Sequence, residues 1–126
     1  MVMTKCFPEY WDFVRTLRMD PRVQHGFIEK ADITIEQQIE YMHKHWKEYY
    51  VCLIDNKPVG FVGSVNRDIR ICTLPEYQGK GIGKFMLDFI MTVFPDSYGK
   101  VKIDNEASKQ LFLSCGLKDN FIIYTK

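Results

Sequence analysis

The stretch that decides the fold runs Leu74-Pro75-Glu76-Tyr77-Gln78-Gly79-Lys80-Gly81-Ile82-Gly83-Lys84. It lies between a strand-like apolar run and an amphipathic helical pattern. Glycine lets the backbone adopt a positive φ and approach a ligand closely. The start of a helix presents free N–H groups and the positive end of its dipole, which together favour phosphate. The sequence therefore predicts a phosphate-binding turn, and the alternative is a strand-to-helix turn without a ligand.

Two familiar phosphate loops do not match this turn. A Walker loop needs a glycine where Gln78 stands and a serine or threonine where Phe85 stands. A dinucleotide fingerprint counted from Gly79 needs its third glycine where Lys84 stands. The turn also follows an antiparallel meander rather than a first parallel strand. Lys80 and Lys84 nevertheless supply positive charge beside the glycines.

On both sides of the turn, the apolar pattern predicts an α/β fold with helices packed on a mixed sheet. The predicted order is strand, helix, helix, three antiparallel strands, helix, strand, helix and strand. The strands are expected at residues 2–6, 49–54, 58–65, 69–74, 100–103 and 121–125. The helices are expected over 8–18, from Thr34 onward, over 82–93, and between a cap at Asn105 and a stop at Gly116.

The second predicted helix has the clearest start signal. Thr34 followed by Gln37 forms a capping-box pattern. After this cap, apolar residues recur at spacings typical of one buried helix face. These residues are Ile35, Ile39, Met42, Trp46 and Tyr49.

Composition excludes several classes of protein. The chain has 126 residues, with 17 lysines and arginines against 16 acidic residues, so its net charge of +1 gives no footprint for nucleic acid or an anionic membrane. Its 46% hydrophobic and 14% aromatic residues exclude disorder. No apolar run is long enough to span a membrane, and no signal peptide is evident. One domain over residues 1–126 is expected, and the aromatic content permits a homodimer.

Cysteine and histidine spacing predicts no metal site. The four cysteines, at 6, 52, 72 and 115, form no close pair, and His43 and His45 point to different sides of a helix. Cys52 and Cys72 lie within apolar runs and are interpreted as small buried hydrophobes. Free thiols favour a reducing compartment, most simply the cytoplasm.

Two segments resemble the GNAT superfamily of N-acetyltransferases, including its small bacterial and phage members. Residues 78–83 match the acyl-coenzyme A loop pattern Gln/Arg-x-x-Gly-x-Gly/Ala at every specified position. The later segment Asn105-Glu106-Ala107-Ser108, with Leu111-Phe112 and Gly116-Leu117, is similar to Asn-x-x-Ala/Ser, Leu-Tyr/Phe and Gly-Phe of that family. The resemblance covers residues 49–126 more closely than the first 48.

The resemblance implies a mixed, largely antiparallel sheet that is splayed between its fourth and fifth strands, with helices on both faces. It implies acetyl-coenzyme A as cosubstrate and no metal. The pantetheine arm would lie in the splay, the pyrophosphate would bind N–H groups of the glycine turn, and Asn105 would approach from the other side. The implied coenzyme A residues are Cys72, Thr73, Leu74, Gln78, Gly79, Lys80, Gly81, Ile82, Gly83, Lys84, Asn105 and Phe112.

The implied reaction moves an acyl group from a thioester to a neutral amine, so a base and a proton donor are sought. Many family members supply the proton from a tyrosine, but Phe112 stands at that position, which leaves Ser108, Ser114 or a water. His25, Glu29 and Asp32 fall in the loop expected to form the acceptor pocket. Asp68 and Asp104 fall at strand ends near the splay, and the alternative for each is a solvated side chain. The predicted catalytic residues are His25, Glu29, Asp104 and Ser108.

Three functions remain open at this point. The first is acetyl transfer from acetyl-coenzyme A to the primary amine of a small molecule or amino sugar, by direct attack. The second is the same chemistry on a protein or peptide amine. The third is a non-catalytic acyl-coenzyme A-binding module, which Phe112 would favour. Residues 17–23 and 33–38 are similar to branches that contain amino-sugar and protein N-terminal acetyltransferases.

Overall fold

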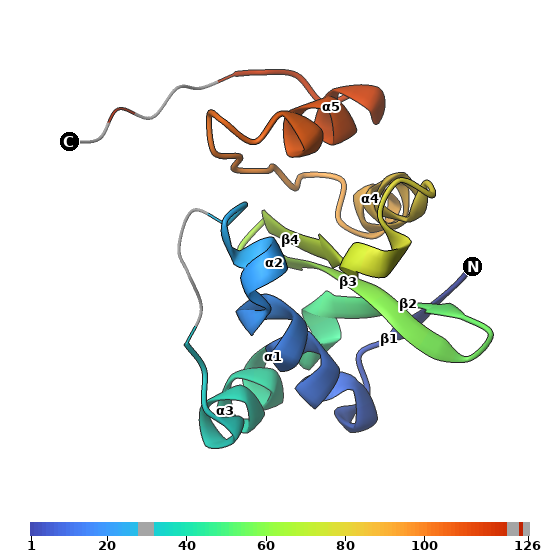
Figure 1. The fold of residues 1–126 in the computed structure, drawn as a ribbon, viewed down its shortest axis with the longest axis vertical. Coiled ribbons are helices and arrows are strands. Elements are labelled where there is room, and N and C mark those ends of the chain that lie inside the picture. Colours follow the sequence, from blue (N-terminus) through green and yellow to red (C-terminus); the bar gives the residue numbers. More distant parts are fainter. Residues whose placement is uncertain (28–31, 121–123, 125–126) are drawn as a thin grey trace.

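Four strands form one antiparallel sheet in chain order β1-β2-β3-β4 (Figure 1). The computed structural model describes residues 1–27, 32–120 and 124. The strands are β1 (Val2–Lys5), β2 (Tyr49–Ile54), β3 (Lys57–Val65) and β4 (Asp68–Thr73). Tight turns at Asp55-Asn56 and Asn66-Arg67, all four residues with positive φ, join β2 to β3 and β3 to β4. The predicted meander is therefore confirmed.

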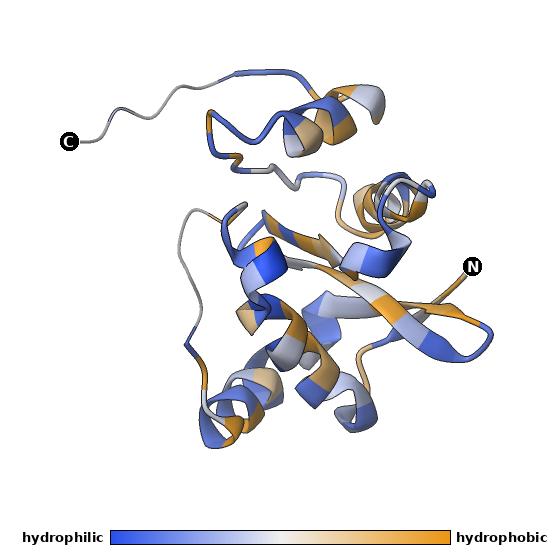
Figure 2. Cartoon of the chain, in the orientation of Figure 1, coloured by the Kyte–Doolittle hydropathy of each residue, from blue (hydrophilic) through white to orange (hydrophobic). Residues whose placement is uncertain are grey.

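Helices cover both faces of the sheet. One face carries α1 (Trp11–Met19), α2 (Pro21–Gln24) and α3 (Ile35–His45), and the other carries α4 (Ile82–Val93) and α5 (Glu106–Ser114) (Figure 1). Short 3₁₀ turns, η1 (Pro8–Tyr10), η2 (Trp46–Glu48) and η3 (Pro75–Tyr77), precede α1, β2 and the glycine turn. Each helix carries both hydrophobic and hydrophilic residues, as expected for one buried and one exposed side (Figure 2).

Alternation along the strands divides the core into two clusters. On β3, Phe61 packs with Trp11 and Leu17 of α1, whereas its neighbour Val62 packs with the α4 side. The α4 cluster contains Ile82, Met86, Leu87 and Ile90, with Leu111 and Phe112 of α5 packed against it. The sheet is therefore buried on both faces, and no helix among the described residues is long and apolar enough to cross a membrane.

The predicted buried face of α3 is partly wrong. The capping box at Thr34 is present, with Gln37 N donating to Thr34 Oγ1 at 3.1 Å and Thr34 N donating to Gln37 Oε1 at 2.9 Å. However, Ile35 is 55% exposed and Ile39 is 43% exposed, so within the helix only Met42 of the predicted face is buried, together with Gln38. Gln38 Nε2 donates to Trp11 O at 2.8 Å, and this hydrogen bond holds the Gln38–Met42 side of the helix against α1.

The predicted fifth strand at residues 100–103 does not form. The chain makes only an isolated parallel bridge between Tyr98 and Asp68, with Ile69 N donating to Tyr98 O at 2.9 Å and Tyr98 N donating to Arg67 O at 2.8 Å. After Tyr98 it leaves β4 and turns toward α5. The splayed sheet thus stays an expectation, and the predicted strand at 121–125 lies outside the described residues except Tyr124.

Gly99, just after the bridge at Tyr98, packs directly against the ring of Phe112. A Cβ built on Gly99 would lie 2.5 Å from Phe112 Cζ, so the ring of Phe112 rests on a residue without a side chain. Gly99→Ala is expected to lower the free energy of unfolding by about 1–3 kcal/mol, because the ring must move out of its place. Asp96→Ala, an exposed change in the same segment, should cost less than about 0.5 kcal/mol. Urea denaturation measures both, and equal stability of the two variants would contradict the packing.

Candidate active site

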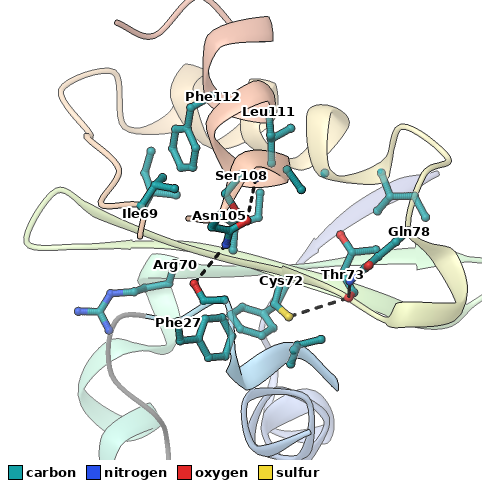
Figure 3. Close-up of a pocket in the computed structure, with 18 of the residues that line it drawn as sticks. Phe27, Ile69, Arg70, Cys72, Thr73, Gln78, Asn105, Ser108, Leu111 and Phe112 are labelled. Atoms are coloured by element: carbon teal, nitrogen blue, oxygen red, sulfur yellow. Dashed lines mark hydrogen bonds between the residues drawn. The ribbon is translucent and has the colours of Figure 1, made fainter. Parts of the chain in front are cut away.

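A cavity of about 620 Å³ follows the edge of β4 that faces away from β3 (Figure 3). Its walls are β4, the start of α4, the inner side of α5 and the segment from α2 to Phe27. The predicted site residues that line it are His25, Cys72, Thr73, Gln78, Gly79, Gly81, Ile82, Gly83, Lys84, Asn105, Ser108 and Phe112. Leu74, Lys80 and Asp104 do not line it, and Glu29 lies outside the described residues.

The glycine turn forms one end of the cavity. Gly79 has φ 79°, and Gly81, the N-cap of α4, has φ 81°. A Cβ at either position would meet nothing within 4 Å, so the backbone of the turn borders open space. Because α4 begins at Ile82, its first N–H groups have no acceptor within the helix. The turn therefore offers donors and room for an anionic group.

The two lysines of the turn behave differently. Lys80 Nζ lies 5.3 Å from the centre of the Tyr77 ring, outside the cavity wall. Lys84 lines the cavity, and its Nζ lies 3.2 Å from Asp88 Oδ2 and 3.4 Å from Ser114 O. Of the two lysines, only Lys84 belongs to the cavity wall, and its ammonium group is paired with Asp88 of α4.

The edge of β4 supplies backbone groups along the cavity. Ile69 N donates to Tyr98 O, away from β3, and backbone groups alternate sides along a strand, so those of Ile71 and Thr73 also point away from β3. Thr73 O accepts from Gln78 Nε2 at 3.4 Å. Leu74 differs, since its N–H donates to Val59 O at 2.8 Å and its carbonyl accepts from Tyr77 N at 2.9 Å. Among the described residues, the backbone groups left free on this edge therefore include those of Ile71 and the N–H of Thr73.

Asn105 joins α5 to the opposite wall. Its Oδ1 accepts from Ser108 N at 3.1 Å, which caps α5, and its Nδ2 donates to Gly26 O at 3.2 Å. Nearby, Lys102 Nζ donates to His25 O at 2.9 Å. The predicted cap at Asn105 is confirmed, and its second hydrogen bond shows that the residue also holds the cavity walls together.

Among the predicted acid and base residues, His25 and Ser108 line the cavity. Asp104 is exposed on the turn before α5, Asp32 is exposed outside the cavity, and Ser114 Oγ donates to Leu111 O at 2.7 Å. Asp68 lines the cavity, but its carboxylate lies 3.4 Å from Arg70 Nη2 and 3.7 Å from Lys100 Nζ. The fold thus brings one imidazole and one hydroxyl of the predicted set to the cavity.

The thiol of Cys72 lies at the cavity and is neutral. Burial raises the pKa of Cys72 to about 12, and its Sγ lies 3.9 Å from Thr73 O. Because the thiolate is the nucleophilic form, this cysteine is a poor nucleophile near pH 7.

Sequence reasoning missed several cavity residues, of which Arg18, Arg22, Phe27, Arg70 and Lys100 matter most for charge and shape. They come from α1, α2, the end of the α2 segment, β4 and the stretch after Tyr98. No motif marks them, because each is a single residue brought in from a different part of the chain. The unusual share of cations becomes visible only when the elements are packed together.

Arg22 links α2 to the turn before the glycines. Its guanidinium lies 2.7 Å from Asp20 Oδ2 and 2.7 Å from Glu76 Oε1. The hydrogen bonds from Arg22 hold the pKa of both carboxyl groups below their usual values.

Within residues 1–27, 32–120 and 124, no group of three or more histidine, cysteine or acidic side chains is placed to hold a metal ion.

Solved structures share this fold at low sequence identity. A spermidine N-acetyltransferase from Vibrio cholerae, in complex with CoA and spermine, has a TM-score of 0.76 and 16% identity over 94% of this chain and 82% of that one. A ribosomal-protein-alanine N-acetyltransferase from Brucella melitensis has a TM-score of 0.79 and 12% identity over 92% of this chain and 83% of that one.

An aminoglycoside N-acetyltransferase in complex with a bisubstrate analog has a TM-score of 0.70 and 13% identity over 99% of this chain and 97% of that one. No curated protein sequence matches the chain significantly. The model of the Acetyltransferase (GNAT) family matches residues 10–117, which is most of the sequence. The chain therefore belongs to the GNAT family of N-acetyltransferases, as its glycine turn and its Asn105 segment indicated.

Proposed function

We propose that this enzyme transfers an acetyl group from acetyl-coenzyme A to the primary amine of a small molecule or an amino sugar, by direct attack. One observation carries the proposal. The free backbone edge of β4 and the glycine turn at the start of α4 border the same cavity. The chemistry of a CoA thioester, a chain of amides that ends in phosphates, matches this order of strand edge and helix start.

The residues present fit that cosubstrate. The open space over Gly79 and Gly81 and the first N–H groups of α4 suit a diphosphate, with Lys84 as the nearby cation. Backbone groups of Ile71 and Thr73 suit the amides of the pantetheine arm, and Asn105 and Phe112 form the opposite wall. When bound, acetyl-coenzyme A supplies the acetyl group as an activated thioester.

The other parts of the cavity serve the acceptor. His25 lines the cavity and carries an imidazole, the side chain best suited to accept a proton from an ammonium near neutral pH. An N–H at the β4 edge suits the oxygen on which charge develops, because backbone donors held in place stabilise such charge. Ser108 offers a hydroxyl where Phe112 has none. Asp104 and Glu29 stay predictions.

Residues 1–126 are proposed to form one acetyltransferase domain that acts in the cytoplasm. Four free cysteines, of which three are buried, support a reducing compartment, since thiols persist there.

Binding of CoA tests the assignment of the turn. Acetyl-coenzyme A and CoA, but not ATP or NAD, should raise the melting temperature, because a ligand of the native state stabilises it. Gly81→Asp should weaken this binding at least about tenfold, since it places a carboxylate in the open space over the turn.

The matched control for that variant is Gly116→Asp. Gly116 also has a positive φ, 86°, and also borders open space, but it lies at the end of α5 outside the cavity. Both variants therefore carry the same backbone strain, and only Gly81→Asp should lose CoA binding. Equal effects of the two variants, or no shift with CoA in the unchanged protein, would contradict the site.

Direct attack has its own test. Because the Cys72 thiol is neutral, the protein should release no thiol from acetyl-coenzyme A until an amine is added. Mass spectrometry of the protein after incubation with acetyl-coenzyme A alone should show no acetyl adduct. A stoichiometric burst of thiol release with an acetylated Cys72 would indicate a covalent intermediate instead.

A further inference from the structure

We propose that the acceptor amine carries an anionic group, a carboxylate or a phosphate, which Arg18 and Arg70 bind. This inference rests on the proposed function and names the substrate class of the same site. It follows from the charge of the cavity, from the position of the cations within it, and from hydrogen-bonding capacity that these cations leave unused.

The lining of the cavity contains more cations than anions. Overall, 17 lysines and arginines face 16 acidic residues. The cations that line the cavity are Arg18, Arg22, Arg70, Lys84 and Lys100. Among the described lining residues, Asp68 is the one carboxylate. Arg22 and Lys84 are paired with carboxylates outside the cavity lining, so the unbalanced positive charge comes from Arg18, Arg70 and Lys100.

These cations lie at two ends. Arg22 and Lys84 belong to the end near the glycine turn, where Arg22 pairs with Glu76 of η3 and Lys84 pairs with Asp88 of α4. Arg70 and Lys100 belong to the start of β4, where both lie within 4 Å of Asp68. A diphosphate on the first N–H groups of α4 would thus lie near Arg22 and Lys84, and not near Arg70 and Lys100.

Arg70 is too far from the glycine turn to serve that diphosphate. Arg70 and Thr73 are three residues apart on β4, which corresponds to about 10 Å along the strand. Figure 3 shows Arg70 directed away from Thr73 and Gln78, on the same side of β4 as Phe27. Alternation along β4 explains this, since Ile69 and Ile71 pack on the α4 side and Arg70 points to the α1 side.

Arg18 lies on that same side. Arg18 comes from α1 and Arg70 from the face of β4 that α1 covers, and both residues line the same cavity. Arg18 is partly buried, and its guanidinium forms no ion pair or hydrogen bond with any described residue. A partly buried guanidinium without a carboxylate partner is uncommon, because burying an unpaired charge is costly.

Arg70 also has unused capacity. Its Nε is buried without a hydrogen-bond partner among the described residues. Its Nη2 lies 3.4 Å from Asp68 Oδ2, and the same carboxylate oxygen lies 3.7 Å from Lys100 Nζ. Asp68 is therefore the one carboxylate paired with Arg70 and Lys100 among the described residues, and Arg18 has none. A second anion would compensate the excess charge and supply acceptors for unused guanidinium donors.

The chemistry of the ligand follows from these groups. Guanidinium binds carboxylate and phosphate through paired hydrogen bonds, whereas it repels a polyamine. The acceptor is then a molecule with an amine near the β4 edge and an anion on the α1 side. An amino acid and a phosphorylated amino sugar both have this character.

Matched acceptors test the inference, with acetyl-coenzyme A held saturating and thiol release recorded. One pair is an amino acid and its amide, a second is an amino sugar and its phosphate, and spermine is the cationic reference. The anionic member should have a kcat/KM at least about tenfold higher than its neutral partner. The two pairs distinguish a carboxylate from a phosphate.

Variants locate the effect. Arg18→Gln should remove most of the preference for the anionic member by raising its KM, and it leaves no carboxylate unpaired. Arg18→Lys should restore part of it, because the charge returns without the planar fork. Arg70→Gln should act like Arg18→Gln. Lys57→Gln, which removes an exposed cation at the start of β3, should leave the preference unchanged.

The melting-temperature shift with CoA distinguishes failure of the anionic-acceptor proposal from failure of the proposed CoA site. An intact shift with equal use of both members, or with a preference for spermine, would overturn the anionic acceptor and leave the CoA site standing. Failure of every anionic member to react or to add to the CoA shift would also overturn it. Loss of the CoA shift itself in the unchanged protein would remove the proposed function.

Discussion

The rest of the structure depends on the edge of β4 that does not pair with β3, because its backbone groups need hydrogen-bond partners. One edge of this strand pairs with β3 over its whole length, and among residues 1–27, 32–120 and 124 the other edge is bridged only near its start, by Tyr98. Backbone groups that point to the second edge must find water or a ligand, because they are strong donors and acceptors. The cavity lies along these groups, between the helices of the two faces.

Contacts between distant segments hold the cavity open in a defined shape. Arg22 joins α2 to η3, and Asn105 joins α5 to the end of the α2 segment. Exposed ion pairs contribute little to stability, so the Arg22 contacts position the walls more than they stabilise the fold. Asn105 does both, since the same side chain caps α5. The segment from α2 to Phe27 is thereby connected to the glycine turn through Glu76 and to α5 through Asn105.

The predictions from the sequence succeeded where the interactions are local. The strand periods, the Thr34 cap, the Asn105 cap and the stop at Gly116 depend on residues only a few positions apart. The buried face of α3 was wrong, because hydrophobicity ranks Ile35 above Gln38 and does not register the hydrogen bond from Gln38 to Trp11. The prediction of a strand at 100–103 was wrong. The chain bridges β4 at Tyr98, and the apolar residues that follow pair with no described strand.

The sequence by itself determined the glycine turn, the caps, the meander and the family to which the chain belongs. Tertiary structure alone decided which residues face the cavity. Arg18, Arg70 and Lys100 come from a helix, a strand and an irregular segment, and no spacing in the sequence relates them. The physical reason is that turns and caps are set by neighbouring dihedral angles and hydrogen bonds, whereas the charge of a cavity is set by the packing of both core clusters on one sheet.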